Sequence, residues 1–78
     1  MKPDALRQLF ADVLNVDAAS LDDDTCPENT PAWDSVHALK LAAAIEEAFQ
    51  IPLSTREIVK MRSIGIARGV LRKKGVDV

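Results

Sequence analysis

Asp34, Ser35 and His37 are the residues whose types and spacing could do chemistry in this chain. Ser35 stands where a polar, proline-containing stretch gives way to a run with helical periodicity, and an acid directly precedes it. Unpaired backbone N–H groups and the positive end of the helix dipole meet at a helix N-terminus, so an anionic group attached to Ser35 would be stabilised there. The pattern therefore predicts a serine that serves as a point of attachment.

The same side chains do not indicate a hydrolytic triad. Ser35 and His37 are two residues apart, and side chains at that spacing on a helix do not face each other. The chain has one His, and it lacks the Gly-x-Ser-x-Gly sequence that surrounds the nucleophile of many hydrolases. We therefore expect no enzymatic activity from this chain, and we expect His37 to be an exposed helix residue.

Length and composition limit the class of protein. The 78 residues allow one domain, covering residues 1–78, and leave little room to enclose a large active-site cavity. The single cysteine, Cys26, excludes an internal disulfide and a zinc site made of Cys and His alone. No signal peptide is visible, and no apolar run approaches the roughly 18 residues of a membrane span. These features predict a cytoplasmic protein without a membrane partner.

Charge is distributed unevenly along the chain. Residues 1–50 carry a net charge of −7 and residues 51–78 a net charge of +5, giving −2 overall. No aromatic residue lies among the bases of the second part, so we expect no nucleic-acid partner. The run Asp22-Asp23-Asp24 lacks the Gly and closing Glu of a calcium-binding loop. It is predicted to be a solvated loop, and no metal site is expected.

Apolar periodicity predicts four helices. The first begins near Pro3, and the second runs from about 35 to 50 with either Asp34 or Ser35 as its N-cap. A capping box of Ser54 and Glu57 predicts a short third helix at 55–61, and Ser63 can cap a fourth. The residues expected in the core are Leu6, Leu9, Phe10, Val13, Leu14, Ala38, Leu41, Ala42, Ile45, Phe49, Ile64, Ala67, Val70 and Leu71.

A long connection separates the first two predicted helices. Between residues 15 and 34 the helical period is lost, and Pro, Asn, Asp and Thr are frequent. Val16, Leu21 and Trp33 are spaced along this stretch as expected anchors onto the core. Loops of this length in small domains are uncommon and often functional, and this one leads directly to Ser35.

The stretch from Trp33 to Phe49 resembles the acyl carrier protein family, whose signature is Asp-Ser-Leu at the start of the second helix. Here the signature reads Asp34-Ser35-Val36. Residues similar to those of the family recur further along, at Leu39, Leu41, Ile45, Glu46, Glu47 and Phe49. The resemblance covers almost the whole chain. It implies an all-α, four-helix acyl-carrier-protein-like bundle with a long loop between helices one and two and a short third helix.

The resemblance also implies a cofactor and partners. A phosphopantetheinyl transferase would attach the 4′-phosphopantetheine arm of coenzyme A to Ser35, in a magnesium-dependent reaction in which Asp34 helps the enzyme recognise the site. The arm would carry an acyl or aminoacyl group as a thioester from a loading ligase to downstream transferases or synthases. The carrier is expected to be a monomer. Its expected docking surface is an outer arc of the second helix made of Val36, Lys40, Ala43 and Glu47.

Three positions depart from the carriers of fatty-acid synthesis. His37, Lys40 and Arg56 stand where acids are common in those proteins, and basic enzyme surfaces would meet like charge at Lys40. We therefore expect a specialised biosynthetic pathway. The Gly-Gly that precedes the serine in many peptidyl carriers is replaced by Ala32-Trp33. A fatty acyl, polyketide, hydroxy acid or amino acid cargo stays open, and an unmodified helical protein–protein interaction module is the alternative.

Overall fold

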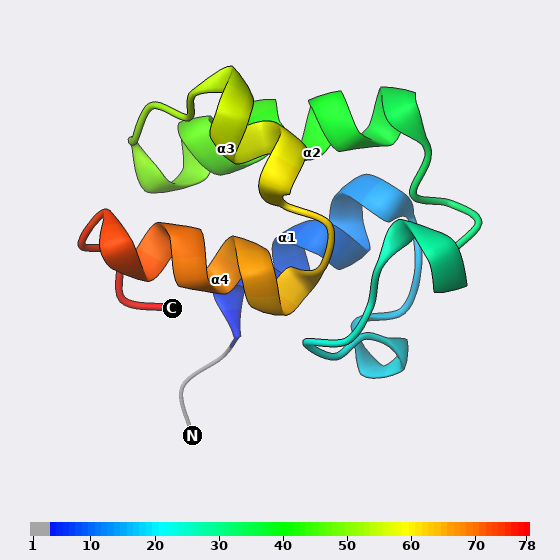
Figure 1. The fold of residues 1–78 in the computed structure, drawn as a ribbon. Helices are drawn as coiled ribbons and strands as arrows, with labels where there is room; N and C mark the ends of the chain where they lie inside the picture. Colours follow the sequence, from blue (N-terminus) through cyan, green and yellow to red (C-terminus); the bar gives the residue numbers. More distant parts are fainter. Residues whose placement is uncertain (1–3) are drawn as a thin grey trace.

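The computed structural model describes residues 4–78, which form an all-helical body (Figure 1). The elements in order are α1 (Ala5–Leu14), the 3₁₀ turns η1 (Ala18–Ser20) and η2 (Pro27–Asn29), α2 (Ser35–Phe49), α3 (Thr55–Lys60) and α4 (Ile64–Lys73). No strand occurs among the described residues. The prediction of a small all-α bundle with a short third helix is confirmed.

The first two helices begin at acidic N-caps and end at left-handed residues. The Asp4 side chain accepts a hydrogen bond from the Arg7 N–H at 3.1 Å, and α1 ends before Asn15, whose φ is 56°. α2 ends before Gln50, with φ 54°, so the helix is one residue shorter than expected. The expected role of Pro3 in the first turn of α1 lies outside the described residues.

Side-chain caps also define the two C-terminal helices. The Ser54 hydroxyl accepts from the Glu57 N–H at 3.1 Å, and the Glu57 carboxylate accepts from the Ser54 N–H at 2.9 Å, so the predicted capping box is confirmed. α3 ends at Lys60, one residue before the expected end. Ser63 caps α4 as predicted, and Gly75 follows that helix with a φ of +89°, a conformation that glycine adopts without strain.

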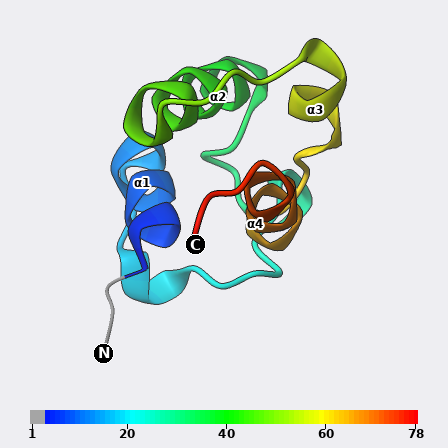
Figure 2. The same cartoon turned by 90° about the vertical axis from the view of Figure 1, so that its left-hand side faces the viewer.

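The core lies where α1, α2 and α4 meet. α1 packs against both α2 and α4, and α3 bridges α2 and α4 on the far side (Figure 2). Several residues predicted to be buried are only partly so, because they lie at the edges of their apolar stripes: Leu9, Val13, Ala38, Phe49 and Val70. The buried apolar residues are Leu6, Phe10, Ala11, Leu14, Leu21, Trp33, Leu41, Ala42, Ile45, Met61, Ile64, Ala67 and Leu71.

The connection between α1 and α2 is more ordered than its sequence indicates. Leu21 and Trp33 are buried as expected, and Val16 is half-buried. The two 3₁₀ turns were not anticipated, because three-residue turns produce no apolar period. Thr25 is buried as well, and its hydroxyl accepts a hydrogen bond from the Asp22 N–H at 3.0 Å.

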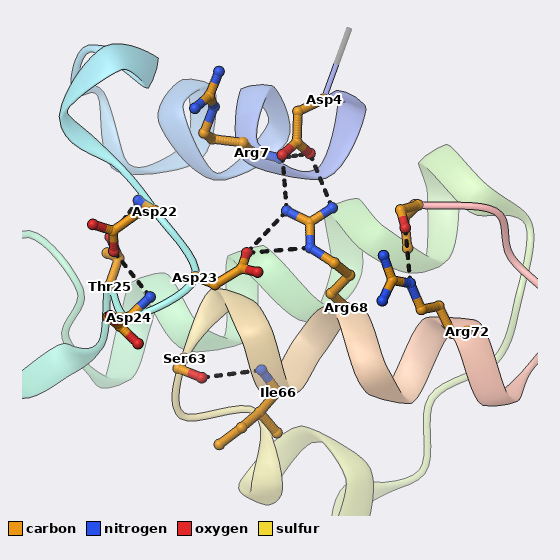
Figure 3. Close-up of polar contacts among 11 residues, drawn as sticks. Asp4, Arg7, Asp22, Asp23, Asp24, Thr25, Ser63, Ile66, Arg68 and Arg72 are labelled. Carbon is orange, nitrogen blue, oxygen red and sulfur yellow. Dashed lines mark hydrogen bonds and ion pairs between the residues drawn. The ribbon is translucent and has the colours of Figure 1, made fainter. Parts of the chain in front are cut away.

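Arg68 of α4 binds two acidic residues from other parts of the chain (Figure 3). Its guanidinium donates to the Asp4 carboxylate at 2.8 Å and 3.3 Å, and its Nε donates to Asp23 Oδ1 at 3.2 Å. Residues 22–24 form the exposed loop that the sequence predicted, and Asp23, still 60 % exposed, also pairs with a residue 45 positions further along the chain. Sequence spacing gives no signal for a contact of this kind.

Among residues 4–78, none of the helices combines the length and the apolar character that crossing a lipid bilayer would need.

Candidate functional site

Ser35 is the first residue of the 15-residue helix α2, and its side chain is exposed. Within the described part of the chain its hydroxyl takes part in no hydrogen bond. The fold therefore makes no use of this hydroxyl. The positive end of the helix dipole lies beside it, and a covalently attached anion would be stabilised by about 0.3–1 kcal/mol at an exposed position of this kind.

Asp34 is the N-cap of α2, which resolves the choice that the sequence left open. Its Oδ1 accepts a hydrogen bond from the His37 N–H at 2.9 Å. That backbone hydrogen bond, and then one from the His37 ring, lowers the pKa of the Asp34 carboxyl below its ordinary value. Asp34 is therefore an anion at neutral pH, directly adjacent to Ser35, and its side chain is 59 % exposed.

His37 is not the freely exposed residue that the sequence suggested. Its Nδ1 lies 2.8 Å from Asp34 Oδ1, and its side chain is 32 % exposed. The ring binds the capping acid because residues three apart are neighbours on a helix. The three-residue spacing of Asp34 and His37 is visible in the sequence, so this contact could have been predicted from it.

Trp33 fixes the start of α2 onto the core. Its indole packs edge-on against Phe10 of α1, with ring centroids 5.2 Å apart and an angle of 61° between the ring planes. Both residues are almost fully buried. Offset and edge-to-face aromatic pairs of this kind contribute about 0.5–1.5 kcal/mol beyond the burial of their area. The two residues that follow, Asp34 and Ser35, thus emerge at the surface from a fixed point.

The four residues of the expected docking arc are all exposed. Val36, Lys40, Ala43 and Glu47 lie on the side of α2 that points away from its buried Leu41, Ala42 and Ile45. Their placement on one outer face is confirmed; their use as a docking surface stays a prediction.

Ser35 lies on the flank of α2 that borders α3. On this flank Glu46 accepts a hydrogen bond from the Leu53 N–H, just before α3, at 3.1 Å. Leu39 and Ser35 precede Glu46 by two and three helical turns and lie on the same flank. Leu39 is 66 % exposed, and sequence reasoning did not identify it as a surface residue.

A shallow groove of about 660 Å³ lies on the other flank of α2, against α1. Leu9, Val13 and Phe49 supply its larger apolar side chains, and Ala44 lies in its wall. Ala44 is nine residues beyond Ser35, which places it on the opposite side of α2 at 3.6 residues per turn. Ser35 and Ala44 therefore lie on different flanks of α2, and the groove borders the C-terminal half of that helix.

No model of a protein family matches the chain, and no curated protein matches it. The likeness to acyl carrier proteins thus stays a resemblance carried by the residues around Ser35 and by the order of the helices. Across residues 4–78 there is also no cluster of three or more His, Cys, Asp or Glu arranged to hold a metal ion.

Proposed function

We propose that this chain is a carrier protein of the acyl-carrier type, with 4′-phosphopantetheine attached to Ser35. The observation that carries the proposal is the exposed, unused hydroxyl of Ser35 at the first position of α2, directly after an ionised N-cap acid. The chain contributes the acceptor and its surroundings, and a separate transferase performs the chemistry.

The attachment step, carried out by the transferase with coenzyme A and Mg²⁺, requires one acceptor hydroxyl from this chain. The Ser35 hydroxyl loses its proton and forms a phosphodiester with the phosphopantetheine phosphorus of coenzyme A, while the nucleotide half leaves with the electron pair of the broken pyrophosphate bond. The new phosphodiester is an anion at the N-terminus of a helix, where the dipole stabilises it. Asp34 stands next to it as a recognition element for the transferase.

The arm supplies the reactive group, a terminal thiol that holds an acyl or aminoacyl cargo as a thioester. The body of the protein needs only weak, exchangeable contacts with a loading ligase and downstream transferases or synthases. The exposed residues of α2 beside Ser35 suit such contacts, because they mix small apolar side chains with charge. We place the protein in a specialised biosynthetic pathway, since Lys40 opposes docking to the basic surfaces of fatty-acid synthesis enzymes.

Intact mass measurement tests the proposal. The apo protein is incubated with coenzyme A, Mg²⁺ and a broad-specificity phosphopantetheinyl transferase, and it should gain the mass of one phosphopantetheine. Ser35→Ala should gain nothing while keeping the parent's circular dichroism, because the hydroxyl has no structural partner. Ser20→Ala, at another exposed serine, is the matched control and should be modified normally.

An interaction module that is never modified is the second candidate, and the exposed apolar residues Val36 and Leu39 favour it. The same experiment separates the two functions. Folded parent protein that stays unmodified with several transferases would contradict the carrier proposal and leave the interaction module.

A further inference from the structure

The outward sides of α2 and α3 form a surface with an apolar centre and basic surroundings. Three large apolar side chains on these helices are 59–67 % exposed, and three cationic side chains on the same helices are exposed as well. We call these six residues the α2–α3 face: Val36, Leu39, Lys40, Arg56, Val59 and Lys60.

Two contacts indicate which flanks of α2 and α3 face each other. The Glu46–Leu53 hydrogen bond marks the flank of α2 that borders α3, and Leu39 lies on that flank two turns earlier. On α3, Glu57 binds Lys74 at 3.0 Å and so marks the flank toward α4. Val59 lies two residues beyond Glu57, about 200° around the helix, and therefore lies on the flank toward α2. Figure 2 shows α3 positioned between α2 and α4.

The cations of the α2–α3 face have no intramolecular partner among residues 4–78. Lys40, Arg56 and Lys60 form no ion pair there. Several other bases of the chain are paired, as in the contacts Arg62–Glu28, Arg68–Asp4 and Lys74–Glu57.

Two acids of α2 border this face. Glu46 is half-buried and its carboxylate accepts the Leu53 N–H, and Glu47 is exposed on the same outer arc as Val36 and Lys40, two turns beyond Lys40. The three exposed, unpaired cations outnumber these two acids, so the α2–α3 face carries a net positive charge in a molecule whose overall charge is −2. Such a local field favours an anionic partner surface and disfavours a cationic one.

We propose that the α2–α3 face binds an acidic surface on a protein partner, with carboxylates against Lys40, Arg56 and Lys60 and an apolar side chain against Leu39 and Val59. The identity of the partner rests on the proposed function. If Ser35 carries a cargo, the partner is an enzyme that acts on this cargo, because Ser35 lies on the same flank of α2. A protein is favoured over a polyphosphate or a lipid surface because the centre of the face is aliphatic and the molecule is acidic overall.

A peptide titration of ¹⁵N-labelled protein tests the charge preference. The probe is a synthetic peptide with two leucines flanked by glutamates, and the matched probe has lysines in place of the glutamates. The glutamate peptide should shift amide signals of the α2–α3 face, with weaker binding at high salt, and the lysine peptide should not. Lys40→Glu should weaken binding about two- to fivefold, as expected for one exposed charge pair.

Lys73→Glu makes the same charge change at an exposed position of α4 and serves as the control. It should leave the affinity for the glutamate peptide within error of the parent value. An equal loss in both variants would show a general charge effect and overturn the proposal. Failure of the glutamate peptide to shift the α2–α3 face, or equal binding of the lysine peptide, would also overturn it.

Parallel binding measurements test whether the α2–α3 face instead binds a nucleic acid, a lipid surface or a second copy of the chain. Tighter binding of oligothymidylate or of phosphatidylglycerol vesicles through the same residues would overturn the assignment to a protein, as would concentration-dependent dimerisation that buries the face. These results are independent of the mass measurement on Ser35. A parent that is never modified contradicts the carrier function alone, and a parent that is modified but shows no preference for the acidic peptide contradicts the docking proposal alone.

Discussion

Arg68 and Asp4 are 64 residues apart in the chain, and Nη2 of Arg68 lies 2.8 Å from Oδ2 of Asp4. Asp4 caps α1, Arg68 lies in the middle of α4, and the same guanidinium holds Asp23 of the connecting segment. One mostly buried side chain thus joins the start of the first helix, the long connection and the last helix (Figure 3). This three-way contact stabilises the body that presents Ser35.

Arg68→Met should lower the free energy of unfolding by about 1–2 kcal/mol, because it keeps the side-chain volume but leaves two carboxylates without their partner. Urea unfolding followed by the fluorescence of Trp33, the only tryptophan, measures this change. Arg72→Met, one turn later at an exposed position where the side chain donates only to the Val78 carbonyl at 2.9 Å, is the control and should stay within about 0.5 kcal/mol of the parent. Equal losses in both variants would show that Arg68 contributes no more than an ordinary surface residue.

Acid should destabilise the parent more than it destabilises Arg68→Met. The hydrogen bond from Arg68 is the main cause of the lowered pKa of Asp4 in the folded protein. The unfolded chain therefore binds more protons than the folded protein does as the pH falls below about 4, the ordinary range for Asp. The stabilisation by Asp4 is complete above that range and is lost as the pH drops through the folded pKa. Urea unfolding at neutral pH and near pH 3 checks this, and parallel pH profiles for the two proteins would contradict it.

The helices could be predicted from the sequence because their signals are local. The capping box of Ser54 and Glu57 and the apolar stripe through Leu6, Phe10 and Leu14 each lie within a few turns of chain. The predicted end of α2 missed only Gln50, whose left-handed conformation an Asn or Gly would have made easier to anticipate.

The remaining features depend on contacts between distant residues. The pairing of Asp23 with Arg68 and the exposure of Leu39 and Val59 follow from how the helices pack, which periodicity does not specify. At the candidate site, residue types indicated a helix start at Asp34 or Ser35, and the structure was needed to show that Asp34 is the cap. The His37–Asp34 contact was missed, although its spacing of three residues is local.

Two glycines of α4 should respond oppositely to alanine. At Gly69 an added Cβ has nothing within 4 Å, so Gly69→Ala should stabilise the protein by about 0.5–1 kcal/mol through helix propensity. At Gly65 the added Cβ would lie 3.0 Å from the carbonyl oxygen of Asp23, to which the Gly65 N–H donates a hydrogen bond. Gly65→Ala should therefore displace the segment that holds Asp23 and lower the melting temperature. A higher melting temperature for both variants would show that the segment around Asp23 can move to accommodate the added Cβ without loss of stability.

The two roles assigned to Asp34, helix capping and recognition by the transferase, can be separated by comparing Asp34→Asn with Asp34→Ala. Asn caps helices about as well as Asp, so Asp34→Asn should keep the parent's melting temperature at neutral pH, whereas Asp34→Ala should lower it. If the transferase reads the negative charge, both variants should be modified at Ser35 more slowly than the parent, and Asp34→Asn will show this with α2 intact. Initial rates from intact mass spectra, with melting temperatures from circular dichroism, provide both readouts. An Asp34→Asn protein modified at the parent's rate would restrict Asp34 to capping, because only its charge has been removed.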